Sequence, residues 1–240
     1  MNIKSYVLAL LCLSAGLGCA SKNKLVEKYP LSEISRPYTL PDNINSWSVL
    51  AFPFESTFLV NPLYWEMSFS DTFSLVWAPL PLGLKWQALN TENHRLGVSA
   101  MYLILGGLAN INYRYKTAGS WALDLDYNYT SFDVYLIKLD MSTGSIGPLY
   151  QFTDRIAGKL FISTFTGRVS SGLVSDILDT AFGGVRSNSS LDFSGTGAGL
   201  DLFYSFNHQW NMKAGVSLLN VKGIGSLTPS GNLSVTHLWD

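Results

Sequence analysis

The fold is decided by residues 110–129, which read NINYRYKTAGSWALDLDYNY. Before the turn at 118–120, Ile111, Tyr113 and Tyr115 fall on one face of an extended chain, with polar residues on the other. After the turn, apolar residues again take every second position, from Trp121 to Tyr129. A period of two over roughly ten residues, with rings near the ends of the apolar face, is typical of strands in a membrane-spanning β-barrel.

The polar face of this hairpin carries charges that lipid would not accept. A Lys or Arg facing lipid at the bilayer centre costs ~2–4 kcal/mol, so Arg114 and Lys116 are expected to point into the lumen. With Gly119 available for a positive φ in the turn, Arg114 faces Asp124 and Asn112 faces Asp126. Opposite charges at such positions stabilise a strand pair by ~0.2–1 kcal/mol. The residues predicted to line the lumen are Asn112, Arg114, Lys116, Asp124, Asp126, Asn128, Lys159 and Lys213.

About twelve candidate strands follow residue 45, near the ~9–11 residues that a tilted strand needs to cross a bilayer. They lie at 46–52, 72–78, 82–89, 95–104, 109–117, 121–129, 132–139, 146–152, 155–165, 191–206, 209–221 and 231–239. Every long connection follows an odd-numbered strand: 53–71, 166–190 and 222–230. The pattern predicts an all-β fold, a closed antiparallel up-and-down transmembrane barrel of about 12 strands (range about 8–12), with an even strand count and all long loops at one end.

The N-terminus resembles an export signal. Residues 1–18 contain an apolar run that is too short to span a membrane as a helix, which needs ~20 apolar residues. The run Gly16-Leu17-Gly18-Cys19 resembles a bacterial lipobox, with Gly16 where that family usually has Leu. This resemblance implies a lipoprotein-type signal peptide and acylation of Cys19. Ordinary cleavage after Ala20 would instead remove that cysteine.

Composition agrees with a barrel in lipid. Charged residues make up 14% of the chain, against ~25% in ordinary soluble proteins. Aromatic residues reach 13%, and a net charge of −1 gives no indication of a nucleic-acid partner. Residues 19–45, interrupted by three prolines, are predicted to be an extended spacer. Residues 46–240 are predicted to form one barrel domain.

The longest connection within the predicted barrel contains a helical pattern. Apolar residues recur at helical spacing between Ser170 and Gly184, and Gly183-Gly184 can end the helix. The apolar residues of this predicted loop helix are Leu173, Val174, Ile177, Leu178 and Phe182. The helix is expected to lie over the mouth of the barrel, to fold into the lumen or to rest on the membrane interface. Its apolar stripe motivates the hypothesis of a gating or ligand-capping role, and the alternative is a helix that only packs on the rim.

Candidate active sites are weak in this sequence. His94, predicted to lie in an external loop, has Ser99 a few residues along, but a catalytic pair also needs a third orienting group. His208 falls in a tight turn, and His237 falls on the lipid-facing side of the last strand. The glycine-rich run 194–199 lacks the Gly-Lys-Ser/Thr of a phosphate-binding loop. No catalytic residue, metal ligand or cofactor is predicted.

The chain resembles bacterial outer-membrane β-barrel proteins over residues 46–239, on strand pattern alone. This resemblance implies a porin-like, non-enzymatic barrel in the outer membrane, with a periplasmic N-terminus and a structural, ligand-binding or narrow transport role. Its partners would be outer-membrane lipid and a small solute or apolar ligand. An alternative is a lipid-anchored periplasmic barrel that binds an apolar ligand inside, with apolar faces inward. A lipid-modifying barrel enzyme is a third possibility.

Overall fold

The computed structural model describes residues 25–51, 63–77, 82–103, 106–117, 119–134, 137–171, 190–222 and 227–240. Each strand pairs antiparallel with its neighbours in the chain, and β1 pairs with β12 to close the barrel. The strands are β1 (Asn45–Ala51), β2 (Leu63–Ser70), β3 (Phe73–Trp77), β4 (Leu82–Asn90), β5 (His94–Leu103), β6 (Gly106–Lys116), β7 (Trp121–Val134), β8 (Ile137–Thr153), β9 (Ile156–Ser171), β10 (Ser190–Ser205), β11 (Trp210–Val221) and β12 (Leu227–Trp239). The predicted fold, a closed antiparallel up-and-down barrel, is confirmed.

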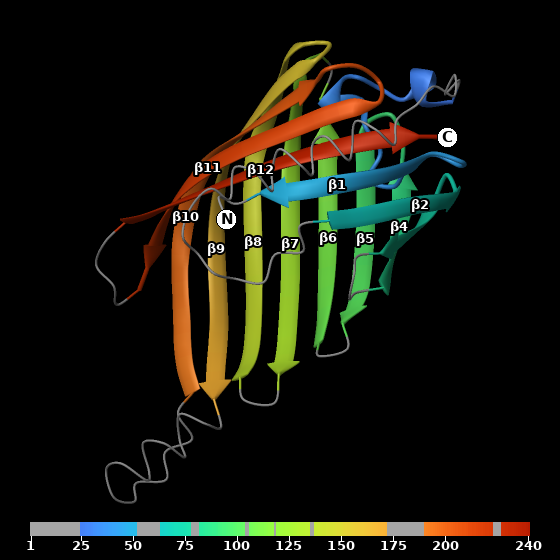
Figure 1. Ribbon diagram of the computed structural model, residues 1–240. Helices are drawn as coiled ribbons and strands as arrows, with labels where there is room; N and C mark the ends of the chain where they lie inside the picture. The colour runs from blue at the N-terminus through green and yellow to red at the C-terminus, as the bar shows by residue number, and fades with distance from the viewer. Residues whose placement is uncertain are drawn as a thin grey trace, which may run out of the picture.

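The two walls of the barrel cross steeply in projection. In Figure 1, β5–β10 run side by side, and β11, β12, β1 and β2 cross in front of them. Strands of a closed barrel tilt by ~35–45° to its axis, so strands on opposite walls cross. The barrel axis therefore runs from upper right to lower left in this view.

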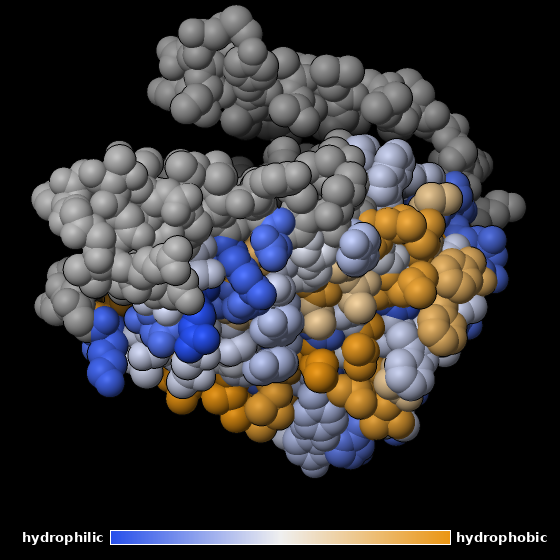
Figure 2. Space-filling view, turned by 90° about the horizontal axis from the view of Figure 1, so that it is seen from below, coloured by the Kyte–Doolittle hydropathy of each residue, from blue (hydrophilic) through white to orange (hydrophobic). Residues whose placement is uncertain are grey.

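The outward face of the strands is apolar. On β7, alternate residues from Trp121 to Tyr129 are exposed. On β9, Leu160 and Ile162 are 60% and 64% exposed, whereas Lys159 on the opposite face is only 6% exposed. Figure 2 shows apolar side chains gathered over much of the described surface on the face it presents. Apolar residues outside and charges inside are the arrangement that a lipid environment favours.

The β6–β7 hairpin has the predicted register. Arg114 pairs with Asp124 and Asn112 with Asp126 across the two strands. Gly119 in the turn has φ of +106°, a conformation that a side chain would disfavour. The turn chemistry and the alternation of the flanking strands thus specify the same register.

One strand, β2, was missed by the sequence analysis, which treated 53–71 as a loop. Residues 63–70 in fact alternate, with Trp65, Met67 and Phe69 on one face and Glu66 and Ser68 on the other. The prolines at 53 and 62 obscured the pattern because they favour a loop.

The sequence also predicted one strand too many, so the predicted number of strands still agreed with the structure. The predicted strand at 132–139 is the end of β7 and the beginning of β8. Residues 140–145, predicted to be a connection, lie within β8 and pair with both β7 and β9. The polar outer residues Asp140 and Ser142 looked like a turn because a strand that extends beyond the apolar belt no longer needs apolar residues.

The connections define two ends of the barrel. The long connections, 52–62 and 172–189, join β1 to β2 and β9 to β10, and the strand ends that they join lie at one end of the barrel, called the long-loop end. The opposite end, the short-turn end, has the connections 71–72, 91–93 and 154–155. With the corrected strands, His94 moves from its predicted external loop to the short-turn end. The predicted loop helix (Leu173, Val174, Ile177, Leu178 and Phe182) and Cys19 lie outside the described residues.

Residues 25–44 cover the short-turn end of the barrel, next to the C-terminus, as Figure 1 shows at upper right. They contain two single turns of 3-10 helix, η1 (Val26–Lys28) and η2 (Glu33–Ser35). No helix in the described ranges is long and apolar enough to cross a membrane. The sequence predicted an extended spacer here, whereas Val26, Ile34 and Leu40 are buried.

Candidate functional site: a charged lumen with a plug

An ion-pair network occupies the inner wall of β6, β7 and β9. Arg114 donates from Nε to Oδ1 of Asp124 at 2.7 Å and from Nη2 to Oδ2 at 2.9 Å. Nζ of Lys159 lies 3.7 Å from Oδ2 of Asp124 and donates to Asp126, which also accepts a bond from Asn112 at 2.6 Å. Arg114 and Asp124 are 5% and 3% exposed. Such charges need partners, because burial of an unpaired charge is expensive.

Further ion pairs lie elsewhere around the inner wall. Nζ of Lys213 on β11 is 2.9 Å from Oδ2 of Asp201 on β10. Nζ of Lys85 on β4 is 2.7 Å from Oε2 of Glu66 on β2. Both carboxylates are buried. Charges of both signs are therefore spread around the barrel rather than gathered on one side.

The N-terminal segment, here called the plug (residues 25–44), joins this network. Arg36 pairs with Glu33 at 2.9 Å within the plug and donates to Oγ of Ser205 on β10 at 2.6 Å. It also donates to Asn211 on β11. Arg114 donates to the backbone carbonyl of Glu33 and lies 3.5 Å from its Oε1. One buried arginine of the wall thus holds both Asp124 and the plug.

Apolar packing seats the plug as well. Ile34 is 2% exposed and packs with Ala122, Leu149 and Ala157 on the inner face of β7, β8 and β9, with Phe203 beside them. Full burial of a side chain of this size stabilises by about 2 kcal/mol. The plug therefore combines a central apolar contact with charged contacts around it.

The backbone of the plug is bound by side chains of the wall. The amide of Tyr38 donates to Oε1 of Gln87 at 2.7 Å, and the amide of Leu40 donates to Oε1 of Glu66 at 3.2 Å. Arg95 donates to the carbonyls of Ile34 and Arg36. Buried amides and carbonyls without secondary structure need such partners.

Electrostatics of the plug centre on Glu33. Burial by itself raises the pKa of this carboxyl, but the guanidinium groups of Arg36 and Arg114 outweigh burial and bring the pKa below its usual value. Glu33 therefore remains ionised at neutral pH, and its ionised form is the one that the plug contacts favour.

The predicted lumen residues lie on the inner face of their strands. The central network contains Asn112, Arg114, Asp124, Asp126 and Lys159, and Lys213 pairs with Asp201. Asn128 accepts a bond from Asn110 and donates to Oγ1 of Thr143 at 3.4 Å. Lys116 lies at the end of β6 opposite Ala122, and no ion pair joins it to Asp124 in the described part of the chain.

Sequence reasoning missed the inner residues Glu33, Arg36, Glu66, Lys85, Arg95 and Asp201. Glu66 was recoverable, since β2 alternates clearly once its flanking prolines are set aside. Glu33 and Arg36 carried no signal, because the plug has no strand or helix periodicity. Within the described residues no group of three or more His, Cys, Asp or Glu side chains could hold a metal ion.

The histidines do not gather into one site. His94 pairs with Tyr115 on the outer face, and its Nδ1 lies 2.7 Å from the Tyr113 hydroxyl. Ser99 pairs with Lys85 on the inner face, so the two members of the candidate dyad lie on opposite sides of β5.

The other two histidines also have separate surroundings. Nδ1 of His208 lies 2.7 Å from the backbone carbonyl of Tyr29 in the plug. His237 lies between Trp47 and Trp210, with ring centroids 5.8 and 4.5 Å away. It belongs to an aromatic group on the outer face.

Comparison with known proteins adds to this description. The chain has the architecture of a closed antiparallel β-barrel with an apolar outer face and charged residues inside. No protein-family model matches the chain, and no curated protein sequence is detectably similar to it.

Several solved structures of outer-membrane proteins are similar to the barrel. The NanC porin is 6% identical, with 81% of this chain and 98% of that chain covered and a TM-score of 0.45. A loop-deletion mutant of OmpT, an outer membrane protein of Vibrio cholerae, is 12% identical, with 82% and 76% covered and a TM-score of 0.42. Ail, the attachment invasion locus protein of Yersinia pestis, is 11% identical, with 82% and 99% covered and a TM-score of 0.32.

The orientation of the strand faces contradicts the alternative of a soluble barrel with an apolar interior. That alternative requires apolar side chains inside and charges outside. Leu160 and Ile162 instead face outward, while Asp124, Lys159 and Asp201 are buried. These charged side chains of the strands therefore face the interior, and the exposed apolar side chains face outward.

Proposed function

We propose that this protein is a non-enzymatic barrel of the bacterial outer membrane that conducts small polar solutes through a narrow lumen, which the plug closes at the short-turn end. The observation that carries the proposal is the plug itself. It is seated on Ile34 and on the contacts of Arg36 and Arg114, inside a wall lined by paired charges.

In this proposal the short-turn end and the N-terminus face the periplasm, because outer-membrane barrels have short turns on that side. Acylation of Cys19 would then tether the chain beside the plug. Metabolic labelling with a radioactive fatty acid tests that part separately, since Cys19→Ser would lose the label.

Single-channel recording in planar bilayers tests the conduction proposal. The Ile34→Asp variant places a charge against Ala122, Leu149 and Ala157 and should release the plug. We expect the wild type to show rare, small openings and Ile34→Asp to show conductance several-fold larger. The control is Glu27→Gln, an exposed position in η1, which should behave as the wild type.

Equal conductance of wild type and Ile34→Asp, with the variant still folded, would contradict a closing role for the plug. A folded barrel is recognised by its different gel mobility in SDS before and after boiling. Absence of conductance in both proteins would contradict transport altogether.

A further inference from the structure

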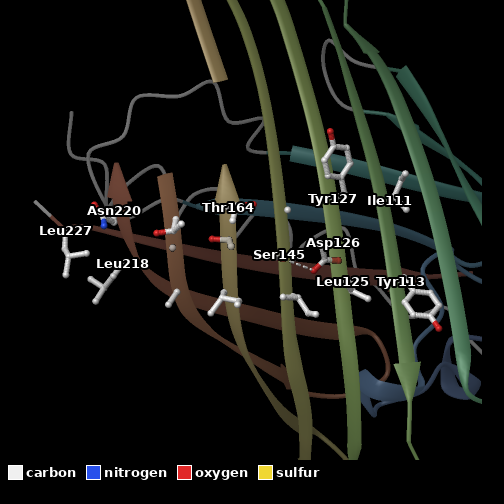
Figure 3. A pocket seen from close by; sticks show the side chains of 17 residues that line it. Ile111, Tyr113, Leu125, Asp126, Tyr127, Ser145, Thr164, Leu218, Asn220 and Leu227 are labelled. Atoms are coloured by element: carbon white, nitrogen blue, oxygen red, sulfur yellow. Dashed lines mark hydrogen bonds between the residues drawn. The ribbon is translucent and has the colours of Figure 1, made fainter. Parts of the chain in front are cut away.

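The outer wall carries a hollow on β6–β12 with a volume of about 900 Å³. One row of its lining runs Tyr113, Leu125, Ile146, Ile162, Ala198 and Leu218, each the register partner of the next. These residues share the face of the exposed apolar residues, so the hollow faces lipid. Figure 3 shows Tyr113 and Leu125 at one side and Leu218 and Leu227 at the other. A barrel has the shape of a hyperboloid, so its outer wall is concave along the barrel axis at mid-height.

A second row of lining residues lies closer to the long-loop end. One of its positions is a glycine, so the outer surface of the wall lacks a side chain there. Tyr127, Gly144, Thr164, Thr196 and Asn220 are successive register partners on the same face. A Cβ built on Gly144 would meet no atom closer than 3.8 Å, the Oγ1 of Thr164. The absent side chain therefore leaves space that a hydrocarbon chain can fill.

A polar pocket of about 650 Å³ continues this surface toward the long-loop end. The first row of outward-facing residues in this pocket contains Tyr129, Ser142 and Thr166. The following row, closer to the long-loop end, contains Asp140 and Arg168. Asp192 pairs with Arg168 at 2.6 Å, and Lys222 also lines the pocket. The pocket thus presents two cations and two carboxylates directly beyond the apolar hollow.

These groups retain capacity for a ligand. The Arg168–Asp192 ion pair uses Nε and Nη2 of the guanidinium, which has five N–H donors in all. Asp140 accepts bonds from Ser131 at 2.6 Å and from Tyr129 at 3.3 Å, both at Oδ1. A carboxylate accepts about four bonds, so Asp140 has room for a cation. Arg168 and the Lys222 ammonium suit a phosphate.

We propose that this composite surface is a binding site for one membrane lipid with a zwitterionic phosphate headgroup. An acyl chain would fill the apolar hollow past Gly144, the phosphate would bind Arg168 and Lys222, and the headgroup ammonium would bind Asp140. The balance of two cations and two carboxylates favours a headgroup of zero net charge over an anionic one. The site depends on insertion of the barrel in a membrane and not on solute conduction.

Native mass spectrometry of the full barrel released from nanodiscs tests the proposal. The nanodiscs contain dioleoyl phosphatidylethanolamine and dioleoyl phosphatidylglycerol in equal amounts. We expect one retained phosphatidylethanolamine, preferred several-fold over phosphatidylglycerol. Arg168→Gln combined with Lys222→Gln should lower the retained fraction about tenfold. The control is Lys138→Gln, an exposed cation beside the pocket in the same part of β8, which should keep the lipid.

A second variant and a competitor separate the two halves of the site. Gly144→Leu fills the apolar hollow and should also lose the lipid, while unheated gel mobility shows that the barrel has folded. Glycerophosphoethanolamine, which lacks acyl chains, should not displace the lipid. Retention by the double variant equal to that of Lys138→Gln, equal retention of both lipids, or displacement by the free headgroup would each overturn the proposal.

Discussion

At the scale of single residues, the inner wall depends on matched charges. Arg114 is buried and holds Asp124 through two hydrogen bonds while donating to the plug. Removal of one partner from a buried pair is costly because the other charge remains in place without compensation. The register that creates this pair was predictable from alternation, but the third contact, with Glu33, was not.

Asp124→Asn is expected to destabilise the barrel by about 3–5 kcal/mol, since it leaves Arg114 buried without its carboxylate. The measurement is the urea midpoint of the barrel in detergent micelles, followed by the loss of the unheated gel band. Asp133→Asn, at an exposed position on the same strand, should leave the midpoint nearly unchanged. Similar midpoints for the two variants would show that the Asp124 pair contributes little.

A close approach of backbones gives a second residue-scale prediction. A Cβ on Gly147 of β8 would clash with the backbone carbonyl oxygen of Leu160 on β9. Gly147→Ala must therefore move the two strands apart, and overpacking of this kind costs about 1–3 kcal/mol. Gly144→Ala on the same strand is the matched control, because its nearest new contact is at 3.8 Å. A lowered thermal midpoint for Gly147→Ala alone is expected, and equal midpoints would contradict the contact.

At the scale of elements, the plug should respond to acid. The pKa of Glu33 is lowered in the folded protein by Arg36 and Arg114 against the effect of burial. A carboxyl with a lowered pKa contributes stability that is present above its ordinary pKa of about 4.3 and is lost as pH falls through the folded pKa. The plug should therefore loosen as the pH falls below the ordinary pKa of a glutamate carboxyl, and pack again on neutralisation.

Protease sensitivity within residues 25–44 measures this loosening, with an acid-active protease and mass spectrometry of the fragments. Glu33→Gln should be cleaved to the same extent at pH 3 and pH 5, whereas the wild type should be cleaved more at pH 3. Identical pH profiles of the two proteins would mean that another group controls the plug.

At the scale of the whole molecule, the barrel reverses the inside and outside of a soluble protein. Leu160→Arg places a charge at an outward position that is 60% exposed, and lipid at mid-membrane depth makes this cost ~2–4 kcal/mol. Ser163→Arg, on the inner face of the same strand, should be tolerated better. Folding yields into lipid vesicles, read from unheated gel mobility, should fall for Leu160→Arg. A larger fall for Ser163→Arg would contradict the assigned faces.

The strands and most of the pairing were predictable from the sequence because each depends on local alternation. The hairpin of β6 and β7 is the best case, since its turn and its two faces agree on one register. The same reasoning failed at β2, where prolines obscured the alternation, and at β8, whose polar outer residues extend beyond the apolar belt. His94 was consequently placed at the wrong end of the barrel.

The sequence by itself determined that this protein is an all-β barrel with an apolar outer face and a charged inner one, because a period of two fixes which residues share a face. Only the tertiary structure decided which segment covers the short-turn end of the barrel and where the outer wall is hollowed. The plug contacts of Arg36 join residues far apart in the chain, to Ser205 and Asn211. The hollow exists only once the registers of β7–β11 place Gly144 and Ala198 each between larger neighbours. Neither arrangement leaves a local pattern, since both depend on contacts between distant segments.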